Sequence, residues 1–354
     1  MEFKSSRLVV PSVQELLAKD PNMVTIPSRY IQNPQNNINN SVSLDHQIPV
    51  INFQNLFLHD DDDHHQSELS NLHSACKDWG FFQLINHGIS DCLIENVKKG
   101  VEDLFKLSVE EKKKLCQLPG DIEGFGQTQV FSEEQKLDWT DYILIFTLPL
   151  ALRKPHLFPN LPITLKQSLE IYSLQLAKLA KDLICQMEKI LGIKNDEISN
   201  LFEDGLQLFS MNCYPPCPEP EKVIGLSHHS DGGCLTFLLQ VNEVQGLQVK
   251  KDGMWLPINP LPNAFVVNIG DVLEILTNGI YRSIEHRVTI NSTQERLSIA
   301  TFHNLSIDSV IAPANTLITP KNPALYKTLS NKEYFKDFFS SELQGKSYLD
   351  SMKL

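Results

Sequence analysis

Residues 205–240 read GLQLFSMNCYPPCPEPEKVIGLSHHSDGGCLTFLLQ, and this stretch decides the fold. Two short apolar runs, Leu206–Tyr214 and Leu235–Gln240, flank a segment rich in proline and glycine, which is typical of strands joined by turns. The same texture continues to residue 303 in four more runs: Gly246–Val249, Phe265–Ile269, Ser283–Ile290 and Leu297–His303. Turn signals lie between the runs at Asp252-Gly253, Gly270-Asp271 and Asn278-Gly279. Many short strands at close spacing predict a sandwich or jelly roll.

The first 200 residues alternate between helical and extended patterns. Apolar residues recur at helical spacing over Glu68–Trp79 and Ser90–Leu115, and residues 80–88 alternate between them like a strand. A longer helix is predicted over 165–191, where one apolar stripe indicates that the helix covers a sheet. A first strand is expected at Ile48-Pro-Val-Ile, and a helical tail near Asn331–Met352.

These patterns predict an α+β fold: an N-terminal α/β region, then an all-β core. The expected parts are an N-terminal arm (1–45), a region of helices and strands (46–200), the jelly-roll core (201–310) and a helical C-terminal tail (311–354). Within the arm we expect a short helix around Val13–Ala18. The Asn-rich run Gln32–Asn40 cannot supply a core and is expected to form a loop.

Composition restricts the kinds of partner. The 354 residues carry a net charge of -12, so a nucleic-acid phosphate backbone would be repelled, and a small molecule is the expected partner. No apolar run approaches the ~20 residues that span a bilayer, and no signal peptide is recognisable. Seven cysteines without a C-x-x-C pair fit reduced thiols. We therefore expect a cytoplasmic monomer that makes no membrane contact.

The strongest chemical signal is His229-Ser230-Asp231. On an extended strand, residues two apart project from the same face, so this imidazole and carboxylate could hold one ion. Two histidines and one carboxylate, with three open coordination positions, form the facial triad of non-haem Fe(II) oxygenases. The third ligand must come from a distant strand, and His286 is preferred because it lies in the middle of a predicted strand.

Other polar groups offer alternatives to this set. His303 is the rival for the third ligand, whereas His228 would face the opposite side of its strand and is interpreted as structural. His87 ends a predicted strand without a nearby carboxylate, so a hydrogen-bonding role is preferred to metal ligation. The run Asp60–Asp63, followed by two histidines, is interpreted as a solvated loop, because a flexible loop holds no fixed coordination geometry.

An anchor for a dicarboxylate is indicated by Arg296-Leu-Ser298, ten residues after His286. The two side chains share a strand face; a guanidinium binds a carboxylate through two hydrogen bonds, and a hydroxyl adds a further donor. The alternative for Arg296 is an ordinary surface ion pair.

Taken together, these motifs resemble those of the plant 2-oxoglutarate/Fe(II) dioxygenases, in particular the branch of the codeine and thebaine O-demethylases. The resemblance covers nearly the whole chain. It rests on Ile48-Pro-Val-Ile, Trp79-Gly-Phe-Phe-Gln, Asn86-His-Gly, Gly124-Phe-Gly126, Asn212-Cys-Tyr-Pro-Pro-Cys-Pro218, His229-Ser-Asp231, His286 and Arg296-Leu-Ser298. It implies a double-stranded β-helix (jelly-roll) core flanked by helices.

The resemblance also implies the cofactors and their ligands. Fe(II) would be held by His229, Asp231 and His286, with 2-oxoglutarate and O2 as co-substrates and ascorbate as reductant. The 2-oxoglutarate carboxylate would lie on Arg296 and Ser298. Tyr214 would assist and Asn212 would shape the same pocket; the alternative for Tyr214 is a plain aromatic at a strand end. By position in the family pattern, the substrate pocket would be formed by Tyr142, Leu144, Ser210, Phe302 and Asn304.

Two positions depart from the family pattern. Ser210 stands where relatives often carry Arg or Lys, so a positive charge facing the substrate is missing, and Asn52 replaces a common Asp. For Leu144 and Phe302 the alternative is a role in the barrel core.

The activity that the resemblance implies is oxidation of an aromatic plant metabolite, alkaloid or flavonoid-like, by O-demethylation or hydroxylation. The alternatives are a metal-dependent non-oxidative enzyme and a silent binding protein, and the Arg296–Ser298 pair argues against the former.

Overall fold

The computed structural model describes residues 8, 10–32, 47–59, 61–118, 120–127, 130–340 and 345–354. Within these residues, two sheets face each other and form the jelly-roll core. In spatial order, the larger sheet consists of β1 (Val50–Asn52), β2 (Phe81–Ile85), β10 (Phe265–Ile269), β7 (Leu235–Gln240), β12 (Arg296–His303), β5 (Gln207–Tyr214), β4 (Asp141–Leu148) and β3 (Gly124–Gly126). The smaller sheet consists of β6 (Leu226–His229), β11 (His286–Val288), β8 (Leu247–Lys251) and β9 (Met254–Pro257).

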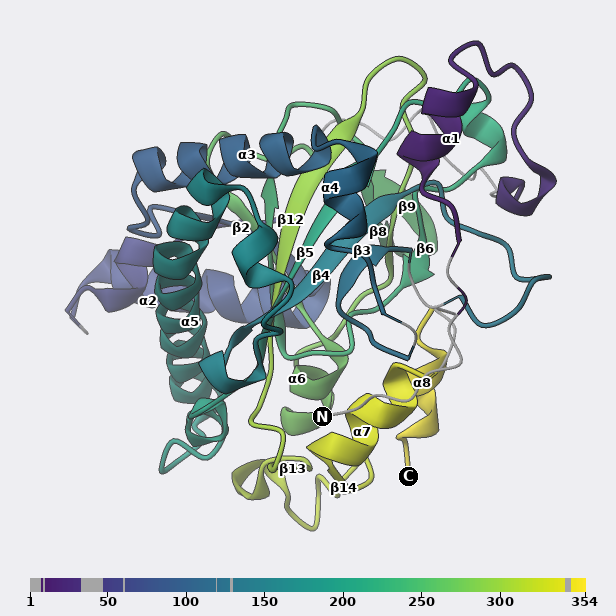
Figure 1. Ribbon diagram of the computed structural model, residues 1–354. Coiled ribbons are helices and arrows are strands. Elements are labelled where there is room, and N and C mark those ends of the chain that lie inside the picture. Colours follow the sequence, from purple (N-terminus) through teal and green to yellow (C-terminus); the bar gives the residue numbers. More distant parts are fainter. Residues whose placement is uncertain are drawn as a thin grey trace.

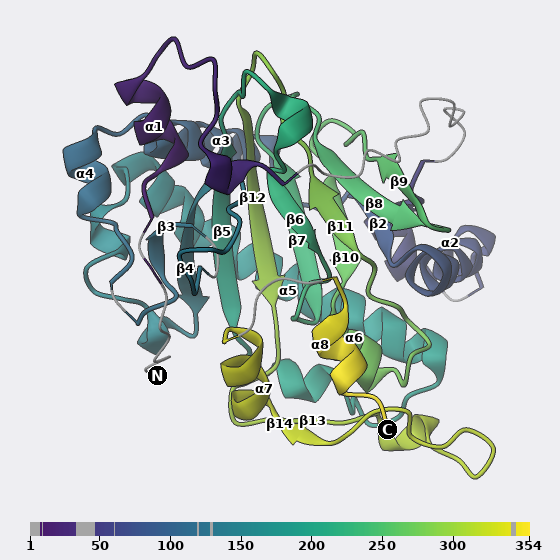
Figure 2. The same ribbon diagram turned by 90° about the vertical axis from the view of Figure 1, so that its right-hand side faces the viewer.

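The helices cover the outside of this core. They are α1 (Val13–Lys19), α2 (Asp63–Ser74), α3 (Asp91–Phe105), α4 (Val109–Lys113), α5 (Ile163–Leu191), α6 (Asp271–Leu276), α7 (Asn331–Phe338) and α8 (Ser347–Ser351). α2, α3 and α5 lie together on one side of the larger sheet (Figure 1). α7 and α8 lie at the opposite end of the molecule from α1, beside the short pair β13 (Val310–Ile311) and β14 (Leu329–Ser330) (Figure 2).

Alternation along the central strands divides the larger sheet into two faces. On β12, Leu297 and Ile299 are buried in the core that includes α3 and α5, whereas Ser298 and Ala300 line a cavity on the other face. Side chains alternate across a strand, so a single strand serves both the packing core and the cavity. α5 supplies the predicted apolar stripe to the packing face, where Tyr172 is fully buried.

The N-terminal arm is tied to the sheet through one carboxylate. Asp141, at the start of β4, accepts hydrogen bonds from the backbone N–H groups of Val13 and Gln14 and from the hydroxyl of Ser12, at 2.7–2.9 Å. A carboxylate at a helix N-terminus satisfies unpaired N–H groups and complements the helix dipole. The predicted helix around Val13–Ala18 is confirmed, whereas residues 33–40 of the Asn-rich run lie outside the described part of the chain.

Three predictions differ from the structure in where helices begin or end. The run Asp60–Asp63 is not simply a loop, because α2 begins at Asp63 and the side chain of Asp62 accepts from the N–H of His64; Asp60 lies outside the described residues. The predicted helix Ser90–Leu115 is interrupted where Ser108 forms a capping box and begins α4. The signal Gly270-Asp271 starts α6 rather than a simple turn.

Several strands also differ from the prediction. β7 and β10 have the predicted bounds, whereas β11 is limited to His286–Val288, so His286 is its first residue and not its middle. β3, β4 and β9 were not predicted as separate strands, and the strand expected at His229 is β6, which ends at that residue. Among the described residues, no helix is both long and apolar enough to cross a membrane.

Candidate metal centre and adjoining cavity

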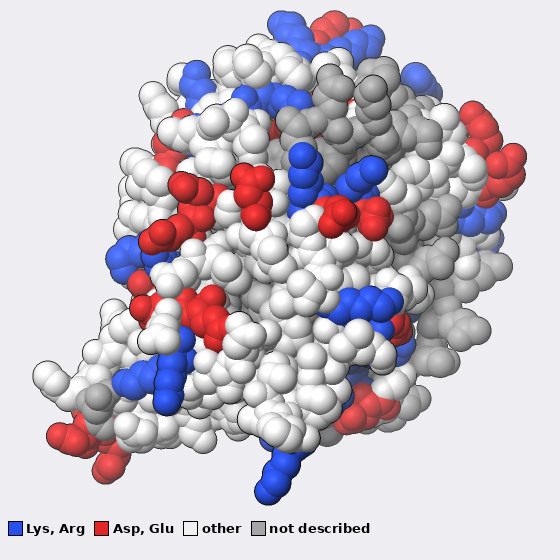
Figure 3. Space-filling model, turned by 90° about the horizontal axis from the view of Figure 1, so that it is seen from below, with Lys and Arg blue, Asp and Glu red and all other residues white. Residues whose placement is uncertain are grey.

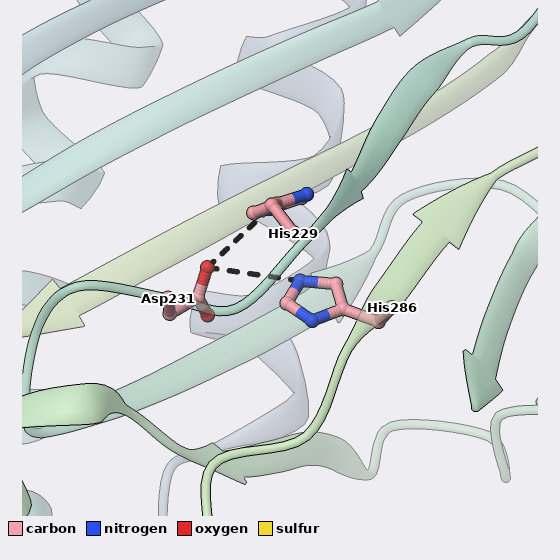
Figure 4. A group of neighbouring side chains, drawn as sticks. All are labelled: His229, Asp231 and His286. Atoms are coloured by element: carbon pink, nitrogen blue, oxygen red, sulfur yellow. Dashed lines mark ion pairs between the residues drawn. The ribbon is translucent and has the colours of Figure 1, made fainter. Parts of the chain in front are cut away.

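Three buried side chains converge at the edge of the smaller sheet. His229 ends β6 and lies directly opposite His286 on β11. Oδ1 of Asp231 lies 3.5 Å from Nε2 of His229 and 3.6 Å from Nε2 of His286, and both rings point toward this carboxylate (Figure 4). In the part of the chain that the structure describes, these residues form the one group of three His, Cys, Asp or Glu side chains close enough to share an ion.

Asp231 reaches this position from a loop, which corrects the expectation of a continuous strand. β6 ends at His229, and the carbonyl of Asp231 accepts a hydrogen bond of 2.7 Å from the N–H of Asp271 at the start of α6. The turn after β6 brings the carboxylate between the two imidazoles.

The hydrogen bonds of the two imidazoles leave one nitrogen of each available. Nδ1 of His229 lies 2.7 Å from the carbonyl of Ser227, and Nδ1 of His286 lies 3.2 Å from the carbonyl of Ile284. A carbonyl oxygen only accepts, so each Nδ1 must carry the hydrogen and each Nε2 keeps its lone pair in the neutral ring. This is the arrangement of metal-ligating histidines, in which the second nitrogen is fixed by a backbone carbonyl.

Sequence reasoning missed the residues that fix the carboxylate. Oδ2 of Asp231 accepts from the Thr236 hydroxyl at 2.6 Å and from Nδ2 of Asn268 at 2.7 Å, so Oδ1 is the oxygen that faces the histidines. Thr236 and Asn268 lie opposite each other on β7 and β10. Nothing in their sequence context marks them, because their role arises from strand pairing between distant segments.

The electrostatics of the group favour a positive charge at its centre. Burial opposes ionisation of Asp231, but the two imidazoles and the Thr236 hydroxyl hold the pKa of its carboxyl well below its usual range. Burial and the adjacent His229 lower the pKa of His286 to about 4. Burial opposes protonation of His229 as well, yet the contact with Asp231 raises its pKa. The carboxylate therefore retains its charge and could bind a cation together with the two imidazoles.

A buried guanidinium lies at another part of the cavity wall. Arg296 is 2 % exposed, and among the described residues no carboxylate contacts it. It lies over the ring of Tyr214 at 5.3 Å, and its hydrogen bonds to the Ser298 hydroxyl and to Oε1 of Gln240 are long, at 3.3 and 3.4 Å. Its Nε has no partner in the described chain. A buried cation without a counter-ion is costly, so this site suits a ligand carboxylate.

A cavity of about 1260 Å³, including its mouth open to solvent, connects the His/Asp/His group with Arg296. Alternate residues of β12, β5 and β4 line it, because they face inward together. Every residue predicted for the co-substrate or substrate pocket lies on its wall: Arg296, Ser298, Tyr214, Asn212, Tyr142, Leu144, Ser210, Phe302 and Asn304. Most of the remaining wall is apolar, so the cavity suits an uncharged ligand with a large apolar surface.

The aromatic wall supplied by the C-terminal tail was also missed. Phe335 and Phe338 of α7, together with Phe339 directly after it, line the cavity. The signal for them was present as closely spaced aromatic residues in an otherwise polar tail. A helical spacing of three and four residues places Phe335, Phe338 and Phe339 on one side of the helix.

The remaining histidines lie outside the group. His303 points to the other face of β12, where it packs edge-on against Phe237, so the prediction of a possible third ligand there was wrong. His228 is exposed and pairs with Glu285 at 3.0 Å. Nε2 of His87 lies 2.8 Å from the carbonyl of Asn263, in agreement with a hydrogen-bonding role.

Comparison with known proteins identifies similar chains over the whole length. Residues 205–305 match the 2OG-Fe(II) oxygenase superfamily, and residues 48–161 match the N-terminal region of a non-haem dioxygenase in morphine synthesis. Codeine O-demethylase of Papaver somniferum is 50 % identical over 351 residues, which cover 98 % of this chain and 97 % of the relative. The oxoglutarate-dependent flavonoid 7-O-demethylase 1 of Ocimum basilicum is 49 % identical over 347 residues, which cover 98 % of this chain and 92 % of the relative.

A solved structure supports the same relationship. The crystal structure of JOX2 in complex with 2OG, Fe and JA is similar to this chain with a TM-score of 0.87, at 34 % identity, and covers 99 % of both chains. The similarity spans the helices, both sheets and the tail.

Proposed function

Because this chain belongs to the 2OG-Fe(II) oxygenase superfamily, we propose that its His/Asp/His group holds the iron and that its cavity admits 2-oxoglutarate together with a neutral aromatic plant metabolite. The enzyme is a 2-oxoglutarate/Fe(II)-dependent oxidoreductase. We propose O-demethylation as its reaction, with hydroxylation of a ring or alkyl carbon as the second candidate. The observation that carries the substrate class is the apolar cavity wall beside the His/Asp/His group.

The donor set fits Fe(II). His229 and His286 would bind through Nε2 and Asp231 through Oδ1, because the other polar atom of each side chain is already fixed by a hydrogen bond. Three ligands on one side leave the remaining positions for the co-substrates. When bound, iron and 2-oxoglutarate supply the O2-dependent oxidation of a C–H bond, and the protein supplies position and exclusion of water.

The guanidinium of Arg296 would bind the far carboxylate of 2-oxoglutarate, with the Ser298 hydroxyl as a further donor and the Tyr214 ring beneath. Asn212 would shape the pocket, since its side chain is held by hydrogen bonds to Ser210 at 2.8 and 3.0 Å. Desolvation of Arg296 is offset once a carboxylate arrives, so the co-substrate site is prepared in advance.

The substrate would lie between the iron and the apolar part of the wall. Tyr142, Leu144 and Phe302 offer apolar surface, and Ser210 leaves the wall without a positive charge. Among the described residues on this wall, Asp231 and Arg296 are the only Asp, Glu, Lys or Arg, and both are assigned above. A substrate carrying a carboxylate or relying on a salt bridge would find no partner there. Codeine O-demethylase and flavonoid 7-O-demethylase, named for O-demethylation, support a methoxylated aromatic substrate.

Product stoichiometry tests the reaction. O-Demethylation converts R–O–CH3, O2 and 2-oxoglutarate into R–OH, formaldehyde, succinate and CO2, whereas hydroxylation adds one oxygen atom without releasing formaldehyde. We expect purified enzyme with Fe(II), ascorbate and methoxylated aromatics to form formaldehyde and succinate in equal amounts. Succinate with an oxygenated product and no formaldehyde would favour hydroxylation, and a lack of substrate-stimulated succinate across methoxylated and unmethoxylated panels would contradict the proposal.

Replacement of Asp231 by Ala tests the metal ligand. The change removes the one carboxylate between two imidazoles, so we expect succinate formation to fall to background while the far-UV circular dichroism stays unchanged. Anaerobic titration with Fe(II) and 2-oxoglutarate should also lose the visible charge-transfer band of the wild type. The matched control is Asp350→Ala, which removes an exposed carboxylate in α8. Retained turnover in Asp231→Ala would remove this residue from the ligand set.

A further inference from the structure

Besides Arg296, a second cavity residue carries a hydrogen-bond donor without a partner in the described chain. Asn304 follows β12, lines the cavity and is 1 % exposed, yet its Nδ2 has no partner in the described chain. A buried amide NH2 without an acceptor is destabilising and is rare in folded proteins. Such a group therefore points to a ligand that supplies the missing acceptor.

The orientation of this amide is fixed by its neighbours. Oδ1 of Asn304 accepts a hydrogen bond of 2.8 Å from the backbone N–H of Leu305 and faces the Cys234 thiol at 3.3 Å. A backbone N–H can only donate, so the atom beside it must be the carbonyl oxygen, and a rotation that exchanged oxygen and nitrogen would bring two donors together. Nδ2 is thus the free end.

Apart from Nε of Arg296, which is assigned to the co-substrate above, the unpaired groups of β12 differ from the donor of Asn304 in their position. The Thr301 hydroxyl and Nε2 of His303 also lack partners among the described residues, but neither residue lines the cavity. Asn304 does, together with Phe302 of the same strand end. Of these three groups, only Asn304 belongs to the wall that a substrate would meet.

α7 is fixed to the same segment and completes the pocket around it. Nδ2 of Asn331, the first residue of α7, donates to the carbonyls of Leu305 and Ser306 at 3.1 and 2.9 Å. This contact holds Phe335 of α7 in one apolar cluster with Phe302. The tail is also held near the metal group, because the N–H and carbonyl of Gly345 bond to His228 and Ser230, on both sides of His229.

Phe338 brings this aromatic wall beside the metal-binding loop. A side chain at Gly232, the residue after Asp231, would meet the Phe338 ring at 2.6 Å. Glycine is therefore required at 232 for the ring to occupy that space. Phe335 and Phe338 present apolar ring surface near the iron site, and the Asn304 amide presents one polar contact on the same wall.

We propose that Asn304 orients the organic substrate by donating a hydrogen bond from Nδ2 to one of its neutral oxygens, while the aromatic ring of the substrate lies against Phe335 and Phe338. This inference rests on the proposed function and adds a specificity-determining residue to it. A hydroxyl, ether or carbonyl oxygen meets the requirement. The single polar contact selects among ring systems that the apolar wall alone would accept, because an apolar wall discriminates weakly.

Two substitutions at Asn304 distinguish loss of the hydrogen-bond donor from loss of the fold. Asn304→Asp keeps an oxygen for the Leu305 N–H but replaces the NH2 donor with a second oxygen; Asn304→Leu removes both functions at similar size. The control is Asn278→Asp, because Asn278 is also a buried amide, and its Nδ2 is paired with the carbonyl of Pro323, away from the cavity. Dissociation constants for codeine and for a 7-methoxyflavone are measured anaerobically at pH 8 with full-length protein loaded with Fe(II) and 2-oxoglutarate.

We expect both Asn304 variants to bind the probe that the wild type prefers roughly tenfold more weakly. Asn278→Asp should bind it as the wild type does. The apparent Michaelis constant for 2-oxoglutarate, from succinate formed without organic substrate, should stay within about twofold in all variants. Unchanged binding in both Asn304 variants would overturn this inference and leave the proposed function standing. A wild-type enzyme that binds neither probe would overturn the proposed substrate class and the inference together.

Discussion

Arg296 has lost its contact with water, and no carboxylate among the described residues replaces it. Burial lowers the pKa of its guanidinium, although the neighbouring Tyr214 opposes this effect. The folded protein therefore carries a destabilised cation that a dicarboxylate would stabilise. We therefore expect selectivity for 2-oxoglutarate over monocarboxylic 2-oxo acids, because a keto acid without the second carboxylate would leave the guanidinium unpaired.

Arg296→Leu tests this role. Removing one partner of a buried, hydrogen-bonded charge pair costs about 2–5 kcal/mol, so we expect the apparent Michaelis constant for 2-oxoglutarate to rise roughly 30-fold or more. The constant for the organic substrate should change far less. Arg153→Leu serves as the control, since Arg153 pairs with Glu170 outside the cavity. Equal increases for both substrates in Arg296→Leu would indicate a merely structural residue.

Glu123 is a second residue whose burial has a measurable consequence. Its side chain is 2 % exposed and accepts the N–H of Phe146 at 2.9 Å. Burial raises the pKa of Glu123 from 4.5 to about 7, with Asp121 adding to the effect, while the Phe146 N–H and Lys154 oppose it. The folded protein thus binds this proton more tightly than the unfolded chain does.

The sign of the pH dependence follows from that difference. Between pH 4.5 and about 7 the folded state holds more protons at this site, so the free energy of unfolding falls as the pH rises, by about 3 kcal/mol in total. Glu123→Gln stays neutral and should lose this dependence while keeping an acceptor for Phe146. Urea unfolding of both proteins at pH 5 and pH 8 measures it. Identical changes with pH in the two proteins would contradict the assignment.

For single residues, the sequence predicts a role when that role depends on neighbours in the chain. Arg296 and Ser298 could be paired in advance, because residues two apart on a strand share a face. Thr236 and Asn268 could not, because they are common residue types whose function depends on Oδ2 of Asp231 reaching them from another segment. The free amide of Asn304 likewise depends on the direction in which the Leu305 N–H points.

The contact between α3 and α5 depends on a glycine. Gly100 lies in the middle of α3, where glycine costs about 1 kcal/mol relative to alanine. An added Cβ would lie 2.7 Å from Cβ and 2.8 Å from Cα of Leu165 in α5. Glycine lowers the helix propensity of α3 at this position, but the missing Cβ permits close approach of α3 and α5. These two helices cover the larger sheet.

Gly100→Ala should therefore destabilise the protein in spite of the better helix former. The added Cβ would contact the backbone of Leu165 as well as its side chain. Overpacking should therefore lower the free energy of unfolding by about 1–3 kcal/mol, measured as a lower midpoint in urea unfolding. Asn96→Ala, at an exposed position of the same helix, should change stability by less than about 0.5 kcal/mol. A Gly100→Ala protein as stable as the wild type would mean that the helices move apart at little cost.

Elements are predictable from sequence when their pattern is complete within the element. β7 and β10 are almost continuously apolar between turn signals, so their bounds could be predicted. β6 (Leu226–His229) is short and partly polar, and it is a strand because it pairs with β11, about 60 residues later in the chain. The break between α3 and α4 lies at Ser108, whose capping signal competes with an uninterrupted helical periodicity.

In the whole molecule, the candidate site joins the two sheets. The histidines belong to the smaller sheet, whereas Arg296 and the two side chains that fix Asp231 belong to the larger one. Iron and 2-oxoglutarate would therefore link the two layers of the core. On the face seen in Figure 3, acidic and basic side chains lie interspersed without a large patch of one sign.

A link between the sheets should appear in global stability. A ligand that binds only the folded state at about 100 times its dissociation constant adds about 2.7 kcal/mol to the free energy of unfolding, which corresponds to a rise of roughly 4 °C in the midpoint of thermal unfolding. We expect anaerobic Fe(II) to raise this midpoint in the wild type and 2-oxoglutarate to raise it further.

Asp231→Ala should lose the rise caused by Fe(II), because the carboxylate between the imidazoles is gone. Arg296→Leu should keep the rise caused by Fe(II), since its metal ligands are intact. It should lose most of the rise caused by 2-oxoglutarate. If 2-oxoglutarate stabilised Arg296→Leu as strongly as the wild type, the co-substrate would not bridge the sheets through this guanidinium.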